Sequence, residues 1–191
     1  MRLIRCPWIW FWRLRHRRGY GVHSPFAYNF ISDVVYEQTP FYSYQALSRL
    51  HPWWVRCMGL YPQTCRRMLF RLANYIHPRS MALVGNLPTE QAYLSAAVPS
   101  ARWIDESELN QGKVDLIFVA REKQAEALAL LTHISAQGAL VMEGIHADEK
   151  ALALWNLLKD AARTGVTFDL FTYGILFFDH QLHKQHYIVN F

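Results

Sequence analysis

The residues with the clearest potential for chemistry follow an apolar run at Met81–Val84. Gly85 and Asn86 come directly after this run, and a helix-forming stretch begins a few residues later. A buried strand, a glycine and a helix in this order form the turn at which nucleotide-binding α/β folds hold their ligand. Such a turn normally contains further small residues, whereas this chain has Leu87 and Thr89 at those places. We therefore predict a cofactor-type turn at Gly85 in a degenerate form.

A second candidate is His146, which follows the apolar run 139–145. Open α/β sheets bind their ligands outside the carboxyl ends of the strands. An imidazole at such a position can take a proton from a substrate. We expect His146 to be the general base if the protein is an enzyme.

Other groups of polar residues have simpler structural interpretations. His180, His183 and His186 are spaced so that their imidazoles converge poorly on a helix, and they lie between two predicted strands. A hairpin loop is therefore the expected structure, and no metal site is predicted. His23 and Ser24 are adjacent, which seldom gives a hydrogen-bonded catalytic pair, so Ser24 is predicted to be a helix cap.

The bulk properties predict a folded cytoplasmic protein. Hydrophobic residues make up 52% of the 191 residues, which is sufficient for one domain with a core of its own. The apolar run Cys6–Trp12 is too short to cross a bilayer and has no small-residue cleavage site after it. Cys6, Cys57 and Cys65 contain no CxxC pair and are odd in number, as expected for reduced thiols that serve in packing.

The charge changes sign along the chain. Residues 1–80 have twelve arginines and two acidic residues, a net charge of +10, whereas residues 81–191 have eight basic and thirteen acidic residues, a net charge of −5. We interpret 1–80 as a helical cap rich in arginine and aromatic residues, with the arginines solvated. The alternative is a surface that binds nucleic acid or an anionic membrane.

Helix signals support the cap. Proline at a first helical turn predicts helices that begin at Pro7, after Ser24 and at Pro62, and His77–Pro78 should end the last of them. The aromatic and basic residues are separated along the first helix. We expect Trp8, Trp53 or Trp54 to pack against other aromatic side chains.

From residue 81 onward, strand and helix patterns alternate. Strands are predicted over 81–85, 101–105, 114–120 and 139–145, helices over 89–98, 122–136 and 148–164, and β-structure over 166–171, 174–179 and 186–191. This alternation predicts an α/β fold with a mainly parallel sheet, helices on both faces and a C-terminal antiparallel hairpin. The strands at 81–85, 114–119 and 139–143 should be parallel neighbours.

The connection between two of these strands is unusually short. Only the eight residues 106–113 separate Asp105 from Val114, whereas a parallel crossover commonly needs about a dozen residues. Eight extended residues reach at most about 26–29 Å. We therefore predict that one helix-and-strand unit is missing and that no helix separates 105 from 114.

Six stretches occur in a characteristic order: RRGYGVHSPFAYNFI (17–31), LFRLANYIHP (69–78), VDLIFVA (114–120), GIH (144–146), VTFDLFTYGILFF (166–178) and KQHYIVNF (184–191). In this they resemble an uncharacterised bacterial group of class I S-adenosylmethionine (SAM)-dependent methyltransferases. The resemblance covers most of the chain. It implies a Rossmann-like sheet over 81–191 that ends in a β-hairpin, behind the N-terminal helical cap, which would help to form the substrate site.

The resemblance also implies which residues would hold SAM. Gly85 matches the glycine of the cofactor loop and Asn86 follows it, while Asp105 or Glu106 matches the acid that holds the ribose. The departures lie at the same site. Leu83 stands where the family has an acid, and an Asp-Asp-Ile-His pattern is here Glu143-Gly144-Ile145-His146.

These residues lead to a methyltransferase-like interpretation with weak or absent SAM binding. An active form would transfer a methyl group to a small acceptor under the cap. A non-catalytic form, or pseudoenzyme, would bind a small molecule or a protein partner through the same cleft.

Overall fold

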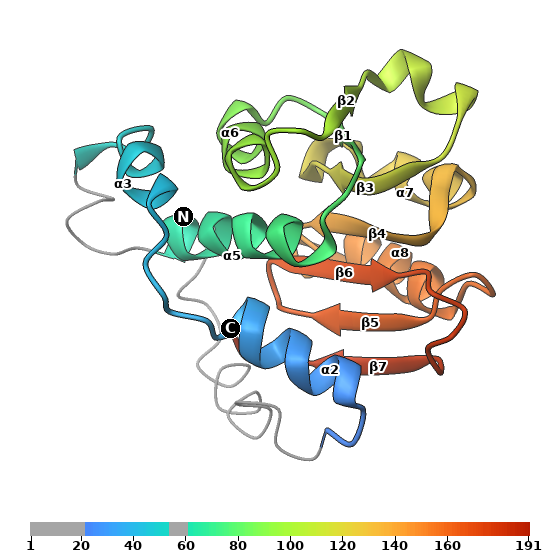
Figure 1. The fold of residues 1–191 in the computed structure, drawn as a ribbon. Coiled ribbons are helices and arrows are strands. Elements are labelled where there is room, and N and C mark those ends of the chain that lie inside the picture. Colours follow the sequence, from blue (N-terminus) through green and yellow to red (C-terminus); the bar gives the residue numbers. More distant parts are fainter. Residues whose placement is uncertain (1–21, 54–60) are drawn as a thin grey trace.

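A seven-stranded sheet lies between two layers of helices. The computed structural model describes residues 22–53 and 61–191 (Figure 1). The strand order is β2-β1-β3-β4-β6-β5-β7. The strands are β1 (Ser80–Val84), β2 (Arg102–Ile104), β3 (Val114–Val119), β4 (Ile134–Glu143), β5 (Val166–Asp169), β6 (Tyr173–Phe177) and β7 (Gln185–Ile188).

The first four strands are parallel, as predicted. β1 pairs with β2 and β3, and β3 pairs with β4. Their apolar runs are continuous because both sheet faces are covered. In β3, for example, Leu116 and Phe118 belong to the core on one face, while Ile117 and Val119 belong to the core on the other. The sheet prediction is therefore confirmed for 81–85, 114–119 and 139–143.

The helices divide between the two faces. The core of one face contains residues of α2 (Pro25–Phe30), the π-helix η2 (Ile31–Val35), α5 (Tyr61–Ile76) and α6 (Pro88–Ala97). The core of the other face contains residues of α7 (Ala127–Leu130) and α8 (Glu149–Asp160). A shorter helix, α3 (Ser43–Ser48), lies at the periphery beyond α5 (Figure 1).

One predicted helix start and one predicted helix end are confirmed in the N-terminal region. Ser24 Oγ accepts a hydrogen bond from Ala27 N at 3.4 Å and caps α2. α5 runs to Ile76, immediately before His77. The helix predicted from Pro7 lies outside the described residues, as do Cys6 and Cys57, whereas Cys65 is buried in the core.

The later helices begin in two different ways. Asp148 Oδ1 accepts a hydrogen bond from Ala151 N at 2.9 Å at the start of α8. α6 begins at Pro88, one residue before the predicted range 89–98, with Leu87 before it and no side-chain cap. Proline supplies the start because its fixed φ suits the first helical position.

The short connector contains helical turns but no further strand. A six-residue 3₁₀-helix, η3 (Glu106–Gln111), lies between β2 and β3. The prediction that no helix separates 105 from 114 is therefore wrong. The predicted lack of a helix-and-strand unit is correct, because the eight residues accommodate only this 3₁₀-helix.

The long helix expected over 122–136 is also wrong. Two 3₁₀-helices, η4 (Arg121–Glu126) and η5 (Leu131–His133), flank the single turn of α7, and β4 already begins at Ile134. Gly138 lies within β4 and not at a helix end. A Cβ there would meet the carbonyl oxygen of Asp115 at 2.7 Å, so the glycine permits close approach of β3.

The C-terminal strands form a hairpin and one additional parallel pair. β5 and β6 are antiparallel, which confirms the predicted hairpin. β7 does not pair with β6, as a hairpin would require, but runs parallel to β5. His180 and His183 lie in the connection, and His186 Nδ1 in β7 is 2.8 Å from Thr167 Oγ1.

One expectation for the N-terminal region is wrong, and a second fails at Trp53. Arg71 is only 6% exposed and donates hydrogen bonds to the carbonyls of Val34 and Val35, so it is not solvated. Trp53 does not pack inward but is 74% exposed. Trp8 and Trp54 lie outside the described residues. Within the described ranges, no helix is both long and apolar enough to span a bilayer.

Candidate functional site

The turn after β1 can be formed only with glycine. Gly85 has a φ of 115°, a backbone conformation that residues with a Cβ rarely adopt. An added Cβ would lie 2.5 Å from the Cβ of Ala120, which follows β3. The ends of β1 and β3 therefore approach each other closely at this glycine.

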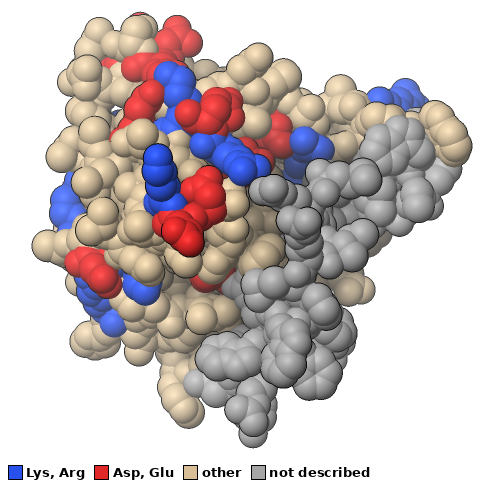
Figure 2. All heavy atoms as spheres, turned by 180° about the vertical axis from the view of Figure 1, so that it is seen from behind, with Lys and Arg blue, Asp and Glu red and all other residues tan. Residues whose placement is uncertain are grey.

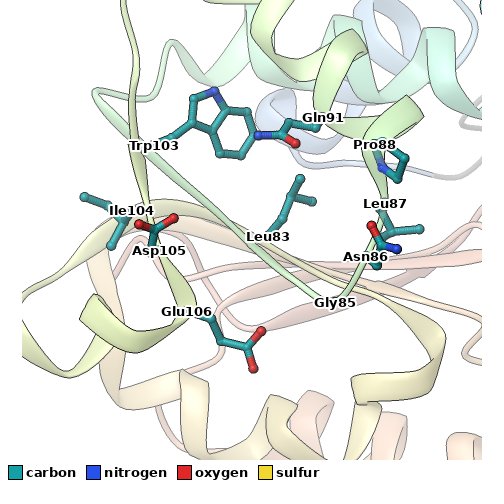
Figure 3. Close-up of a pocket in the computed structure, with 10 residues that line it drawn as sticks. All are labelled: Leu83, Gly85, Asn86, Leu87, Pro88, Gln91, Trp103, Ile104, Asp105 and Glu106. Atoms are coloured by element: carbon teal, nitrogen blue, oxygen red, sulfur yellow. The ribbon is translucent and has the colours of Figure 1, made fainter.

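A pocket of about 210 Å³ lies beside the turn (Figure 3). Its lining contains all four residues predicted to bind a cofactor: Gly85, Asn86, Asp105 and Glu106. The side chain of Leu83 stands between the acidic residues and the loop after Gly85 (Figure 3). Small-molecule sites usually measure about 300–1,000 Å³. The pocket is thus in the predicted place but small.

One of its two acids is already paired. Lys123 Nζ lies 3.1 Å from Glu106 Oε1 and 2.9 Å from Glu126 Oε1, and these contacts raise the pKa of Lys123. Glu122 Oε1 accepts a weak hydrogen bond from Asn86 N at 3.4 Å. The Asp105 carboxylate has no hydrogen-bond or ion-pair partner among the described residues. Asp105 is therefore the acid more available to a ligand.

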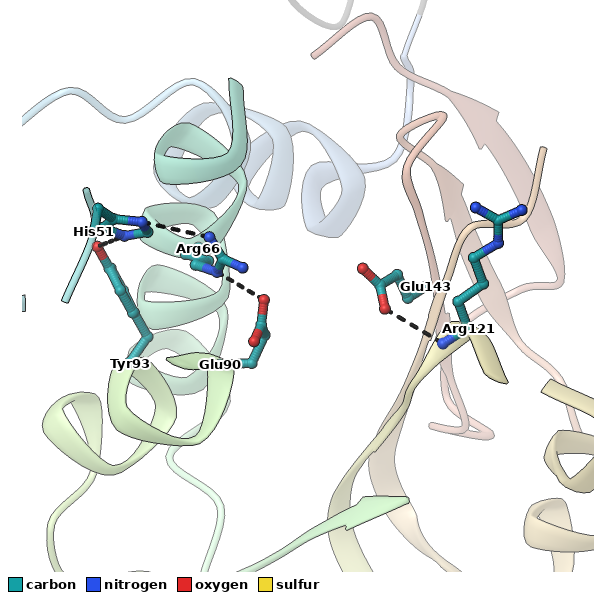
Figure 4. Close-up of polar contacts among 6 residues, drawn as sticks. All are labelled: His51, Arg66, Glu90, Tyr93, Arg121 and Glu143. Carbon is teal, nitrogen blue, oxygen red and sulfur yellow. Dashed lines mark hydrogen bonds and ion pairs between the residues drawn. The ribbon is translucent and has the colours of Figure 1, made fainter. Parts of the chain in front are cut away.

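A buried polar network lies on the helical side of the same sheet edge (Figure 4). Arg66 Nε donates to Glu90 Oε1 at 2.7 Å, and Arg66 Nη1 lies 3.4 Å from His51 Nδ1. His51 Nε2 is 2.9 Å from the hydroxyl of Tyr93. Burial, and next the charge of Arg66, lower the pKa of His51. This neutral imidazole accepts at Nδ1 from Arg66 and donates from Nε2 to Tyr93.

Glu143 faces this network from the end of β4. Its carboxylate points toward Arg66 and Glu90 (Figure 4), and Oε2 accepts from Arg121 N at 3.3 Å. Burial raises the pKa of Glu143, and the negative charges of Glu90 and Glu122 raise it further. A carboxylate with a raised pKa is a suitable general base near neutral pH.

His146 lies at the same edge of the sheet but outside the pocket. Its Nε2 is 2.7 Å from Asp169 Oδ2, and its ring stacks on Phe171 with centroids 5.1 Å apart. Asp169 Oδ1 also accepts a hydrogen bond from Phe171 N. A histidine held by a carboxylate has the orientation that a general base needs. His146 does not line the pocket that contains Gly85.

Sequence reasoning missed the polar network. Glu143 was noted only as the remaining acid of a motif, and Glu90 only as part of a helix. Arg66 had no signal, because nothing local indicates that it reaches across to α6. Within the described ranges, no cluster of three or more histidine, cysteine, aspartate or glutamate side chains could hold a metal ion.

Comparison with solved structures identifies the fold. A methyltransferase from Geobacter sulfurreducens matches with a TM-score of 0.51 at 13% identity, over 75% of this chain and 91% of the other. The O-methyltransferase TomG from Streptomyces achromogenes, involved in tomaymycin synthesis and solved in complex with SAM, matches with a TM-score of 0.50 at 12% identity, over 78% and 96%. No protein-family model and no curated protein matches the sequence.

The chain therefore has the fold of the class I SAM-dependent methyltransferases. Their identity to this chain is low, so the likeness concerns the fold, and the resemblance noted in the sequence agrees with it.

Proposed function

We propose that this methyltransferase-like protein binds a small ligand in the cleft beside Gly85 and binds SAM weakly or not at all. The observation that carries the proposal is the ion pair between Lys123 and Glu106 next to a pocket of about 210 Å³. Lys123 is already paired with Glu106, which is one of the two acids that could hold the ribose of SAM. Leu83 offers no carboxylate at the position where the family has an acid. Asp105 remains as the main polar anchor for a ligand.

The size of the effect follows from the missing contacts. A lost hydrogen bond weakens binding by about 1 kcal/mol, and a lost bond to a charged group by about 1.5–3 kcal/mol. Two or three such losses shift a dissociation constant from micromolar toward millimolar, since each 1.4 kcal/mol is about tenfold. A non-catalytic role as a ligand-binding module follows if SAM is not held.

Calorimetric titration with SAM and with S-adenosylhomocysteine tests the proposal. Wild-type protein should give a dissociation constant near millimolar or no heat. Lys123→Ala should strengthen binding several-fold, because it frees Glu106, whereas Lys150→Ala, at an exposed position of α8, should change nothing. Asp105→Asn should abolish the remaining affinity. A low-micromolar constant for the wild type would refute the proposal.

Methyl transfer is the second candidate, and the environment of Glu143 favours it. A partly buried carboxylate with a raised pKa points from the end of β4 toward Arg66 and Glu90 (Figure 4). It would take the proton of a small acceptor, with His146 and its partner Asp169 as the alternative base. Production of S-adenosylhomocysteine with a panel of small hydroxyl acceptors tests this role. Activity that is lost in Glu143→Gln but kept in His146→Gln would assign the base to Glu143.

A further inference from the structure

The segment that contains α3 has a buried side and an exposed side. Tyr44 and Leu47 are buried, and Tyr44 packs against Phe70 of α5 with ring centroids 5.2 Å apart. His51 is also buried and joins the segment to Tyr93 of α6. These inward contacts hold the segment firmly on the helical layer. The exposed side chains of the segment therefore belong to a stretch of backbone that is held in place.

The exposed side chains of this segment include Gln45 and Ala46, and also large apolar and basic ones near its two ends. Tyr42 is fully exposed, Leu50 is 52% exposed and Trp53 is 74% exposed. Arg49 is exposed beside them. We call Tyr42, Arg49, Leu50 and Trp53 the α3 tip. Large apolar side chains usually lie in the core, and exposed ones that gather on one segment are typical of interaction surfaces.

The charge of this part of the chain indicates what covers it. Between Glu37 and Glu90 the sequence has six arginines and no acidic residue. Arg66 and Arg71 are used inside the protein, and Arg67 lies over the Tyr44 ring. On the face seen in Figure 2, the described part of the projection beyond the main body has basic but no acidic side chains, whereas both signs mix elsewhere.

We propose that the α3 tip docks on an anionic lipid bilayer. Tryptophan and tyrosine favour the boundary between lipid headgroups and acyl chains, because one end of each ring is polar and the other apolar. An arginine beside them attracts anionic headgroups. Interfacial side chains of this kind, with a positive charge beside them, attach a protein to one face of a bilayer. Such attachment places the cleft beside Gly85 near a membrane, independently of what the cleft binds.

A second copy of the chain fits the tip less well. A stable interface needs about 800 Å² and about 20–30 residues from each partner. The α3 tip offers four side chains. A bilayer requires no such complementary area, because a few interfacial side chains and a positive charge give reversible binding.

Vesicle co-sedimentation tests the proposal with the full chain. Wild-type protein should bind phosphatidylcholine vesicles that contain 30% phosphatidylglycerol and should bind pure phosphatidylcholine far more weakly. Trp53→Ser should weaken partitioning by roughly tenfold and Arg49→Gln by about fivefold. Leu157→Ser is the matched control, since Leu157 is 60% exposed on α8, and it should bind like the wild type. Raising the salt concentration should weaken binding.

Three results would overturn the proposal. Equal loss in Leu157→Ser and Trp53→Ser would show that general surface hydrophobicity causes sedimentation. Self-association in light scattering that Trp53→Ser abolishes, without vesicle binding, would assign the tip to a second copy. Binding of a duplex oligonucleotide that depends on Arg49, again without vesicle binding, would assign it to nucleic acid. Circular dichroism of each variant verifies that it is folded.

Discussion

At the scale of single residues, the burial of charged side chains affects the stability of the fold. Glu143 and Arg71 are two such side chains with opposite consequences. Arg71 satisfies buried carbonyls, whereas Glu143 keeps a carboxylate where burial disfavours its charge. Removing the charge of Arg71 should therefore lower the free energy of unfolding, whereas removing the charge of Glu143 should raise it.

Glu143→Gln should stabilise the protein at neutral pH. Its pKa in the folded state is raised above the value of about 4.3 in the unfolded chain. The folded state then binds more protons, so the carboxylate lowers stability as the pH rises through this window. The glutamine variant should unfold at higher temperature than wild type at pH 7 and at the same temperature near pH 4. An exposed control, Glu149→Gln, should show no such pH-dependent difference, and a lower unfolding temperature for Glu143→Gln at pH 7 would contradict the prediction.

Arg71→Met should destabilise the protein by about 2–4 kcal/mol, because it leaves the carbonyls of Val34 and Val35 without their donors. Urea denaturation measures the difference in the free energy of unfolding. Arg79→Met, at an exposed position, should stay within about 0.5 kcal/mol of wild type. Similar losses in the two variants would contradict a special role for Arg71.

At the scale of elements, the close pairing of β3 and β4 determines where the sheet tolerates a side chain. Gly138→Ala should destabilise the protein by about 1–3 kcal/mol, because the new Cβ meets the Asp115 carbonyl at 2.7 Å and the Ile134 side chain at 2.8 Å. Gly112→Ala is the matched control: nothing lies within 4 Å of its added Cβ. Its backbone is extended, so the change should be neutral or slightly stabilising. Thermal unfolding of both variants checks the pair, and equal effects would show that the contact is unimportant.

At the scale of the whole molecule, the helices before residue 80 and the sheet share a core. Phe30 of α2 packs on Phe168 of β5 with ring centroids 4.3 Å apart, and Leu69 and Leu72 of α5 belong to the same cluster. A division of the chain into a cap (1–80) and a Rossmann-like part (81–191) is thus compatible with one cooperative unit.

We expect a single unfolding transition. Tryptophan fluorescence reports mainly on residues 1–80, which contain five of the seven tryptophans, while far-ultraviolet circular dichroism reports on the whole chain. The two probes should give coincident denaturation curves. Separated midpoints would indicate that the cap unfolds independently.

The sequence by itself determined the parallel half of the sheet and the start of α2. The apolar run 114–119 predicts a strand covered on both faces, and Ser24 with the following proline predicts a helix start. These features depend on residues that are neighbours in the chain, where periodicity and capping act directly. The short connector 106–113 is also a local feature, and its length excludes a further helix-and-strand unit between β2 and β3.

Only the tertiary structure decided which polar groups meet and how the last strand pairs. Arg66 and Glu90 are 24 residues apart, and Lys123 and Glu106 are 17 apart, so no local pattern indicates either ion pair. β7 pairs parallel with β5, although its sequence is equally compatible with a hairpin. A glycine is required at position 138 of β4 because the backbone of β3 passes close to it. In each case the outcome depends on which surfaces pack together, and packing is a property of the folded chain rather than of any segment.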